Sequence, residues 1–213
     1  MELMAAIAIV AILTVLTLPS FAALSKAGRF SSAVGEVSET LDLARQLAVA
    51  RNTYVWVAFT VPASPTDPPL GTLVLASTDG TNPLPSDWST SVSLPDSRFL
   101  LVAKRASYAQ CQFLDAGALT TKQIPSLPAP AGADANALAS NLSFTMTTPT
   151  GLTTFNRVIE YTPSGLAYNG PNSVAFVEFG LQPRPVPNGP TIGHDVACIR
   201  VPFITGRTLL YRP

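Results

Sequence analysis

Histidine and charged residues are scarce in this chain. It has one histidine, and 12% of its 213 residues are charged, against an average of about 25%. Basic and acidic side chains balance at 13 each, so the basic excess that binds nucleic acid is missing and DNA binding is not indicated. His194 has no second histidine to share a catalytic metal, and the chain has no GxSxG, Walker or glycine-rich dinucleotide motif. We therefore expect that the protein is not an enzyme.

Cysteine is also rare, with only Cys111 and Cys198. Their spacing fits no zinc pattern. In an exported domain they are a candidate disulfide that closes a long loop, a link typically worth about 2–4 kcal/mol. The alternative is two separate buried thiols. Both stay open, because the sequence does not give the distance between the two Cα atoms.

No cofactor is expected, and calcium is the only metal ion that we retain as a candidate ligand. Carboxylates in or near predicted loops could bind it, although none has EF-hand spacing. They are Asp79, Asp87, Asp96 and Asp115. We expect the two tryptophans, Trp56 and Trp88, to pack in the core or at its edge.

What the chain does have is a long apolar run at its start. Glu2 is followed by no charged residue until Lys26, and a helix of that length would cross a bilayer core of about 30 Å. An ionised carboxylate in hydrocarbon costs about 2.5–3.5 kcal/mol. Glu2 therefore either lies in water at the interface or pairs with a cation, for which the α-amino group of an adjacent subunit is the natural candidate. Pro19 interrupts the far end of the run.

The sequence ELMAAIAIVAILTVLTLPSF resembles the N-terminal helix of type IV pilins and pseudopilins. In that family a prepilin peptidase cleaves a short basic leader and N-methylates the new terminus. A glutamate then neutralises the N-terminus of a neighbour, and a proline follows 17 residues later, the spacing of Glu2 and Pro19. The resemblance implies that these two are assembly residues. Met1 directly precedes Glu2, and a short basic leader ending in glycine upstream of Met1 would assign the class.

The next stretch predicts that the helix continues past Pro19 to about Asn52. Its apolar positions recur at steps of three and four, which places them in one stripe. They are Phe30, Val34, Val37, Leu41, Ala44 and Ala48. A helix over residues 3–51 would be about 70–75 Å long, too long for a compact domain to bury. We therefore expect an α+β fold in which a long N-terminal helix protrudes and packs its second half on an antiparallel sheet, as in the pilin-like ladle.

A second resemblance lies in LDLARQLAVARNTYVWVAF, residues 41–59. It is similar to the helix-to-strand junction of the H-type pseudopilins of the general secretion pathway and of FimT-like minor pilins. Arg45 and Arg51 also suit the C-terminal half of a helix. The segments IEYTPSGLA and CIRVPFITGRTLLY resemble the late strands of the same proteins, which end in a hairpin with a TGR turn.

The rest of the chain reads as a β-rich domain with proline-rich loops, since it holds most of the 20 prolines. Strands are expected over 54–61, 71–78, 98–104, 110–114, 141–147, 156–162, 173–181, 196–203 and 207–211, with one short strand within 79–96. Residues 116–140 are expected to form a long excursion with a short helix near 133–139. The domain organisation is thus a hydrophobic transmembrane or filament-core helix over 1–25, its amphipathic continuation over 26–53 and a periplasmic or extracellular domain over 54–213.

The resemblance implies a minor pilin or pseudopilin that spans the inner membrane once and then joins a type IV pilus or a type II secretion pseudopilus. Its expected partners are other pilin or pseudopilin subunits, the inner-membrane assembly platform, the prepilin peptidase and, before assembly, membrane lipid. The expected roles are filament initiation, protein secretion or surface presentation. The alternatives are a major pilin, a signal-anchored extracytoplasmic ligand-binding domain, and a secretory signal cleaved after Ala22 or Ala23.

Overall fold

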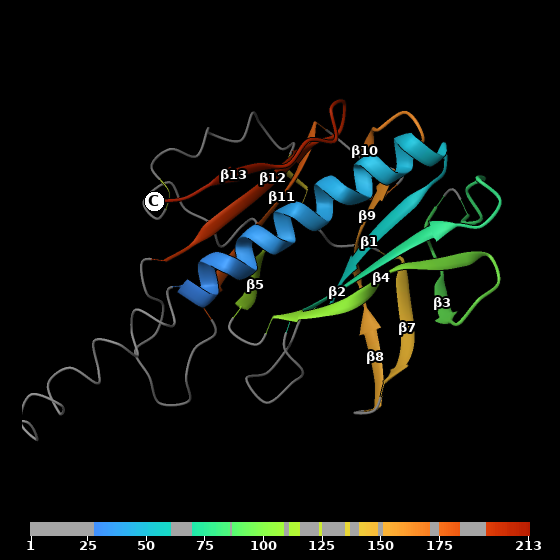
Figure 1. The fold of residues 1–213 in the computed structure, drawn as a ribbon, viewed down its shortest axis with the longest axis horizontal. Helices are drawn as coiled ribbons and strands as arrows, with labels where there is room; N and C mark the ends of the chain where they lie inside the picture. The colour runs from blue at the N-terminus through green and yellow to red at the C-terminus, as the bar shows by residue number, and fades with distance from the viewer. Residues whose placement is uncertain are drawn as a thin grey trace, which may run out of the picture.

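The computed structural model describes ten parts of the chain. They are residues 28–60, 70–85, 87–108, 111–115, 124, 135–136, 141–148, 151–170, 175–183 and 195–213. This part of the protein is mostly β, with about 48% of it in strands and one helix over residues 28–51 (Figure 1).

The helix buries one side and exposes the other. All six residues of the predicted stripe are buried, from Phe30 at 5% exposure to Ala48 at 0%. Outside this stripe, Leu43 and Val49 are 52% and 48% exposed. The helix ends at Asn52, whose φ of 49° reverses the chain before the first strand. The periodicity therefore predicted the buried side of the helix, and the β-branched and aromatic residues that begin after Asn52 predicted its end.

The first sheet has five strands in the order β10-β9-β1-β2-β4, with all pairs antiparallel. Its strands are β1 (Val55–Phe59), β2 (Leu70–Ser77), β4 (Phe99–Tyr108), β9 (Arg157–Tyr161) and β10 (Ala167–Tyr168). Alternate residues of β1 face the helix or the opposite side, because strand side chains have a period of two. Val57 packs in the cluster beneath the helix, whereas Trp56 packs in the cluster behind the sheet.

The second sheet lies next to the first and packs against the same buried side of the helix (Figure 1). Its order is β13-β12-β11-β5, and β6 pairs in parallel with β11. Its strands are β5 (Cys111–Asp115), β6 (Ala135–Asn136), β11 (Phe176–Pro183), β12 (Ala197–Pro202) and β13 (Leu209–Tyr211). One hydrophobic cluster joins the helix to both sheets. Within it the rings of Phe59 on β1 and Phe179 on β11 are 5.5 Å apart.

The third sheet covers the back of the first. It consists of β3 (Ser91–Leu94), β7 (Ser143–Thr148) and β8 (Gly151–Phe155), with β3 parallel to β7. Phe99 of the first sheet contacts Phe144 of the third at 5.4 Å and Trp56 at 5.2 Å, both edge to face. The described residues thus form two cores, one under the helix and one between the first and third sheets.

The fold class expected from the sequence is wrong. In place of a long protruding helix packed on a sheet, the described part has one helix of about 36 Å among three sheets, and strands outweigh it. The reason is composition: after residue 53 the chain is rich in β-branched and aromatic residues, and turn residues divide it into many short strands.

All ten expected strands, including the short one within 79–96, have a counterpart, although their bounds differ by several residues. The prediction missed β8 and β10, since GLTTF is polar in part and Ala167–Tyr168 is too short to show a period. It was wrong near residues 133–139, where Ala135 and Asn136 pair with β11 as a strand. Such a short strand is stabilised by its partner and not by its own sequence.

Candidate assembly site

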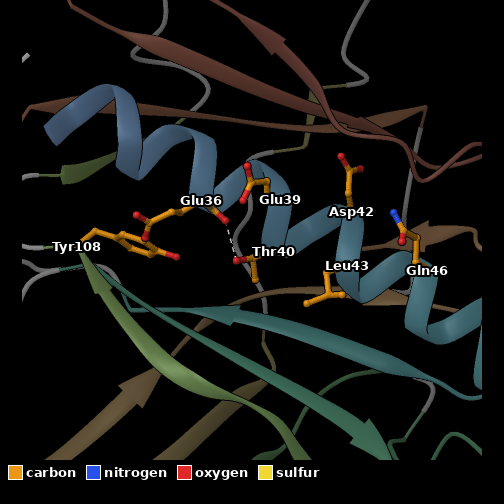
Figure 2. A pocket seen from close by; sticks show the side chains of 7 residues that line it. All are labelled: Glu36, Glu39, Thr40, Asp42, Leu43, Gln46 and Tyr108. Atoms are coloured by element: carbon orange, nitrogen blue, oxygen red, sulfur yellow. Dashed lines mark hydrogen bonds between the residues drawn. The ribbon is translucent and has the colours of Figure 1, made fainter. Parts of the chain in front are cut away.

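A groove runs along the exposed side of the helix and ends at Tyr108 on β4 (Figure 2). Its volume is about 590 Å³. Helix residues three or four apart share a face, so the helix contributes six of the lining side chains. These are Glu36, Glu39, Thr40, Asp42, Leu43 and Gln46.

Local hydrogen bonds fix part of this groove. Thr40 donates from its Oγ1 to the carbonyl oxygen of Glu36 over 2.7 Å, the bond drawn in Figure 2. Ser32 donates to the Glu36 carboxylate over 3.2 Å, and the backbone N–H of Thr208 donates to Asp42 over 3.3 Å. The groove therefore offers three carboxylates beside the exposed Leu43 side chain, an arrangement that suits a contact with another protein.

Within the same stretch of the helix, Arg45 contacts two tight turns of the domain. Its Nε donates to the carbonyl oxygen of Thr205 over 2.7 Å. A Cβ on Gly206 would lie 2.3 Å from the carbonyl oxygen of Gly165 and 3.2 Å from Cδ of Arg45. Both glycines have a positive φ, 80° at Gly165 and 58° at Gly206. The guanidinium therefore lies over two turns that only glycine allows to approach so closely.

These two turns also join the first and second sheets. The N–H of Ala167 on β10 donates to the carbonyl oxygen of Phe203, just after β12, over 2.9 Å, whereas the N–H of Gly206 donates to the carbonyl oxygen of Pro202 over 2.8 Å and closes the second turn itself. The segments singled out by sequence, LAR in the helix, PSG after β9 and TGR after β12, thus meet at one point. We call Arg45, Gly165, Thr205 and Gly206 the helix–turn junction.

The two assembly residues predicted from sequence, Glu2 and Pro19, lie outside the described residues, as does His194. Within the described ranges, no helix is both long and apolar enough to cross a membrane. Trp56 and Trp88 are both buried, at 0% and 5% exposure, which confirms that they pack in the core.

The two cysteines are separate, buried thiols. Cys111 on β5 pairs with Pro183 of β11, and Cys198 on β12 pairs with Gly180 of the same strand. Positions three apart on a strand point to opposite faces, so Cys111 faces the helix and Cys198 faces the other side with Ile124. The candidate disulfide is not formed, and the sheet between the two thiols is the reason. Burial raises the pKa of each thiol to about 12.

Three of the four carboxylates considered for calcium accept hydrogen bonds within local turns, and the side chain of the fourth, Asp115, lies outside the part that the structure describes. Asp79 accepts from Ser77 and from the backbone and hydroxyl of Thr81, which lowers its pKa. Asp96 pairs with Arg98 at 2.8 Å, which lowers the pKa of Asp96 and raises that of Arg98. Asp87 accepts from the N–H of Ser89. The part of the chain that the structure describes contains no group of three or more metal-ligating side chains.

Sequence reasoning missed two buried charged sites. Glu160 on β9 is 4% exposed and accepts from Trp56 and Asn82. On the outer face of the second sheet, Glu178 pairs with Arg200, whose guanidinium carbon lies 4.2 Å from the centroid of the Phe176 ring. The available signal was a charged residue between apolar neighbours in a strand, as in VIEY, FVEFG and CIRVP, because such a residue is buried only with a partner.

None of the protein families, curated proteins or solved structures with which the chain was compared matches it.

Proposed function

We propose that the protein is a subunit of a helical filament of the type IV pilin and pseudopilin class, acting as a minor pilin or pseudopilin. The observation that carries the proposal is the helix–turn junction. The three segments that resemble H-type pseudopilins are far apart in sequence, yet they meet at Arg45 and Thr205. A chance similarity in three separate stretches would not require them to be in contact.

The position of the exposed helix side supports a role in assembly. The helix follows directly on the apolar N-terminal run in the sequence, and its outer side keeps Leu43 half exposed beside the groove. A repeated head-to-tail contact that does not close into a ring gives an open helical polymer. Glu2 would set the axial register of neighbouring copies, because an unpaired carboxylate in an apolar environment is costly.

Cysteine cross-linking in membranes tests this proposal. The native thiols are buried, so a cysteine introduced as Leu43→Cys is the main reactive thiol of the folded chain. We expect a bismaleimide to link it to a second copy or to a co-expressed subunit with the same apolar Glu–Pro pattern. Leu152→Cys on β8, where the native side chain is 71% exposed, is the matched control on the third sheet and should give fewer adducts.

Glu2→Leu then separates assembly from membrane attachment. We expect the variant to stay in the membrane fraction and to lose the Leu43→Cys adducts. Adducts that survive in Glu2→Leu, or that form equally from Leu152→Cys, would contradict the filament proposal. They would favour a signal-anchored ligand-binding domain, for which an apolar tether is sufficient.

A further inference from the structure

The back of the first sheet carries a row of side chains centred on Glu160. The strand register pairs Glu160 with Trp56 on β1 and with Tyr168 on β10. Tyr54 precedes Trp56 by two residues, and Thr162 follows Glu160 by two. Because strand side chains alternate between the two faces with a period of two, Tyr54 lies on the same face as Trp56, and Thr162 lies on the same face as Glu160. The sheet thus brings a carboxylate and three aromatic residues from two distant parts of the chain together.

Asn82, Pro85 and Trp88, from the segment between β2 and β3, close this row into a pocket. Asn82 donates from Nδ2 to Oε2 of Glu160 over 3.1 Å, and the buried Trp88 adopts a left-handed φ of 57°. The resulting pocket has a volume of about 350 Å³, within the usual size of small-molecule sites. It is lined by Tyr54, Asn82, Pro85, Trp88, Glu160, Thr162, Tyr168 and Gly170.

The carboxylate in this pocket has no cationic partner among the described residues. Both of its hydrogen bonds reach Oε2, one from Nε1 of Trp56 over 2.9 Å and one from Asn82. Burial is the main cause that raises the pKa of Glu160 to about 7, against the two hydrogen bonds that lower it. A buried carboxylate is stabilised in its charged form by a nearby cation, and no Lys, Arg or His lines the pocket.

We propose that this pocket binds an alkylammonium group, with Glu160 as the counter-ion and Tyr54, Trp88 and Tyr168 as the aromatic wall. Aromatic rings attract ammonium ions through their negative faces, and a cage of rings is a recurring way to bind methylated amines. Two of the rings are already held by parallel stacking, Tyr54 on Trp56 and Tyr168 on Phe203, each at 6.3 Å. The site does not depend on filament assembly.

The two tryptophans of the chain make the test direct. Both lie at the site, because Trp56 donates to Glu160 and Trp88 lines the pocket. The full chain in a non-ionic detergent is titrated with butylammonium and with tetramethylammonium, and the two indole N–H NMR resonances are followed. Pentanol and tert-butanol are the neutral counterparts. We expect both cations to shift the resonances in a saturable way and the alcohols to cause no saturable shift.

Variants assign the binding to named groups. Glu160→Gln keeps an acceptor for Trp56 and Asn82 but removes the charge, and we expect it to weaken cation binding at least about tenfold. Tyr54→Leu should weaken it several-fold, whereas Tyr54→Phe should retain it. Asp195→Asn, which removes an exposed carboxylate elsewhere, is the control and should bind as the parent chain does.

The relative affinities identify the natural head group. Tighter binding of butylammonium indicates a primary amine that donates to Glu160, and tighter binding of tetramethylammonium indicates a quaternary amine. Equal response to cations and alcohols, no saturable response to either cation, or full binding by a folded Glu160→Gln variant would each overturn the proposal.

Discussion

Arg45 and Thr205 are 160 residues apart in sequence, and the Nε of one donates to the carbonyl oxygen of the other over 2.7 Å. This contact connects the helix to the turn between β12 and β13. Because the acceptor belongs to the backbone, substitution of Thr205 does not remove it. The strength of the contact has to be tested through Arg45 and through the glycines beneath it.

Arg45→Met is expected to lower the free energy of unfolding by about 1 kcal/mol, since it removes one hydrogen bond at a partly exposed site. Arg45→Lys should lose most of the same amount, because an ammonium lacks both the Nε donor and the flat surface that lies over Gly165 and Gly206. Urea unfolding of the two variants measures this. A lysine variant as stable as the parent would show that only charge matters here.

Gly206→Ala is expected to destabilise the fold by about 2 kcal/mol or more. The new Cβ would meet the backbone oxygen of Gly165 at 2.3 Å, and the φ of 58° disfavours any side chain. Gly35→Ala is the matched control: nothing lies within 4 Å of its Cβ, and the helix should gain up to about 1 kcal/mol. Thermal melts of both proteins should move in opposite directions, and a shared direction would refute the account of the junction.

The stability of the domain should fall as the pH rises from about 4.5 to about 7. Burial raises the pKa of Glu160 to about 7 in the folded protein, above the ordinary value of 4.5 for a glutamic acid side chain. Between these two pKa values the folded state therefore binds more protons than the unfolded state. The stability that Glu160 contributes is complete below about pH 4.5 and is lost as the pH rises through about 7. The expected change is on the order of 3 kcal/mol, at about 1.4 kcal/mol for each pKa unit.

Glu160→Gln isolates this contribution, because glutamine does not titrate and can still accept from Trp56 and Asn82. We expect its free energy of unfolding to exceed that of the parent protein near pH 8 and to vary less between pH 5 and pH 8. Denaturant titrations at the two ends of this range give both quantities. An unchanged pH dependence in the variant would show that other groups are responsible.

Both native cysteines should resist thiol reagents until the protein unfolds. The thiolate is the reactive species, and burial raises the pKa of Cys111 and Cys198 to about 12. We expect two thiols to be alkylated in denaturant without reductant and almost none in the native state. Recovery of a bridged pair under non-reducing conditions would contradict the arrangement of the second sheet, which separates the two side chains.

The sequence by itself determined the local elements. Steps of three and four placed the buried side of the helix correctly, because helical period depends only on neighbouring residues. Runs of β-branched and aromatic residues located ten strands, and Ile204, Thr205 and Gly206 were expected to join the last two, which pair as a hairpin. The apolar stretch that holds Glu2 and Pro19 is likewise a property of sequence alone.

Only the tertiary structure decided how these elements combine. The division into three sheets, the placement of Cys111 and Cys198 on opposite faces and the pairing of Glu160 with Trp56 all follow from strand register. Register links residues about 20 to 105 positions apart in these pairs, and a shift of one residue would exchange the two faces of a strand. The strand register is determined by the packing of both cores together, so it cannot be predicted from any short stretch of the sequence.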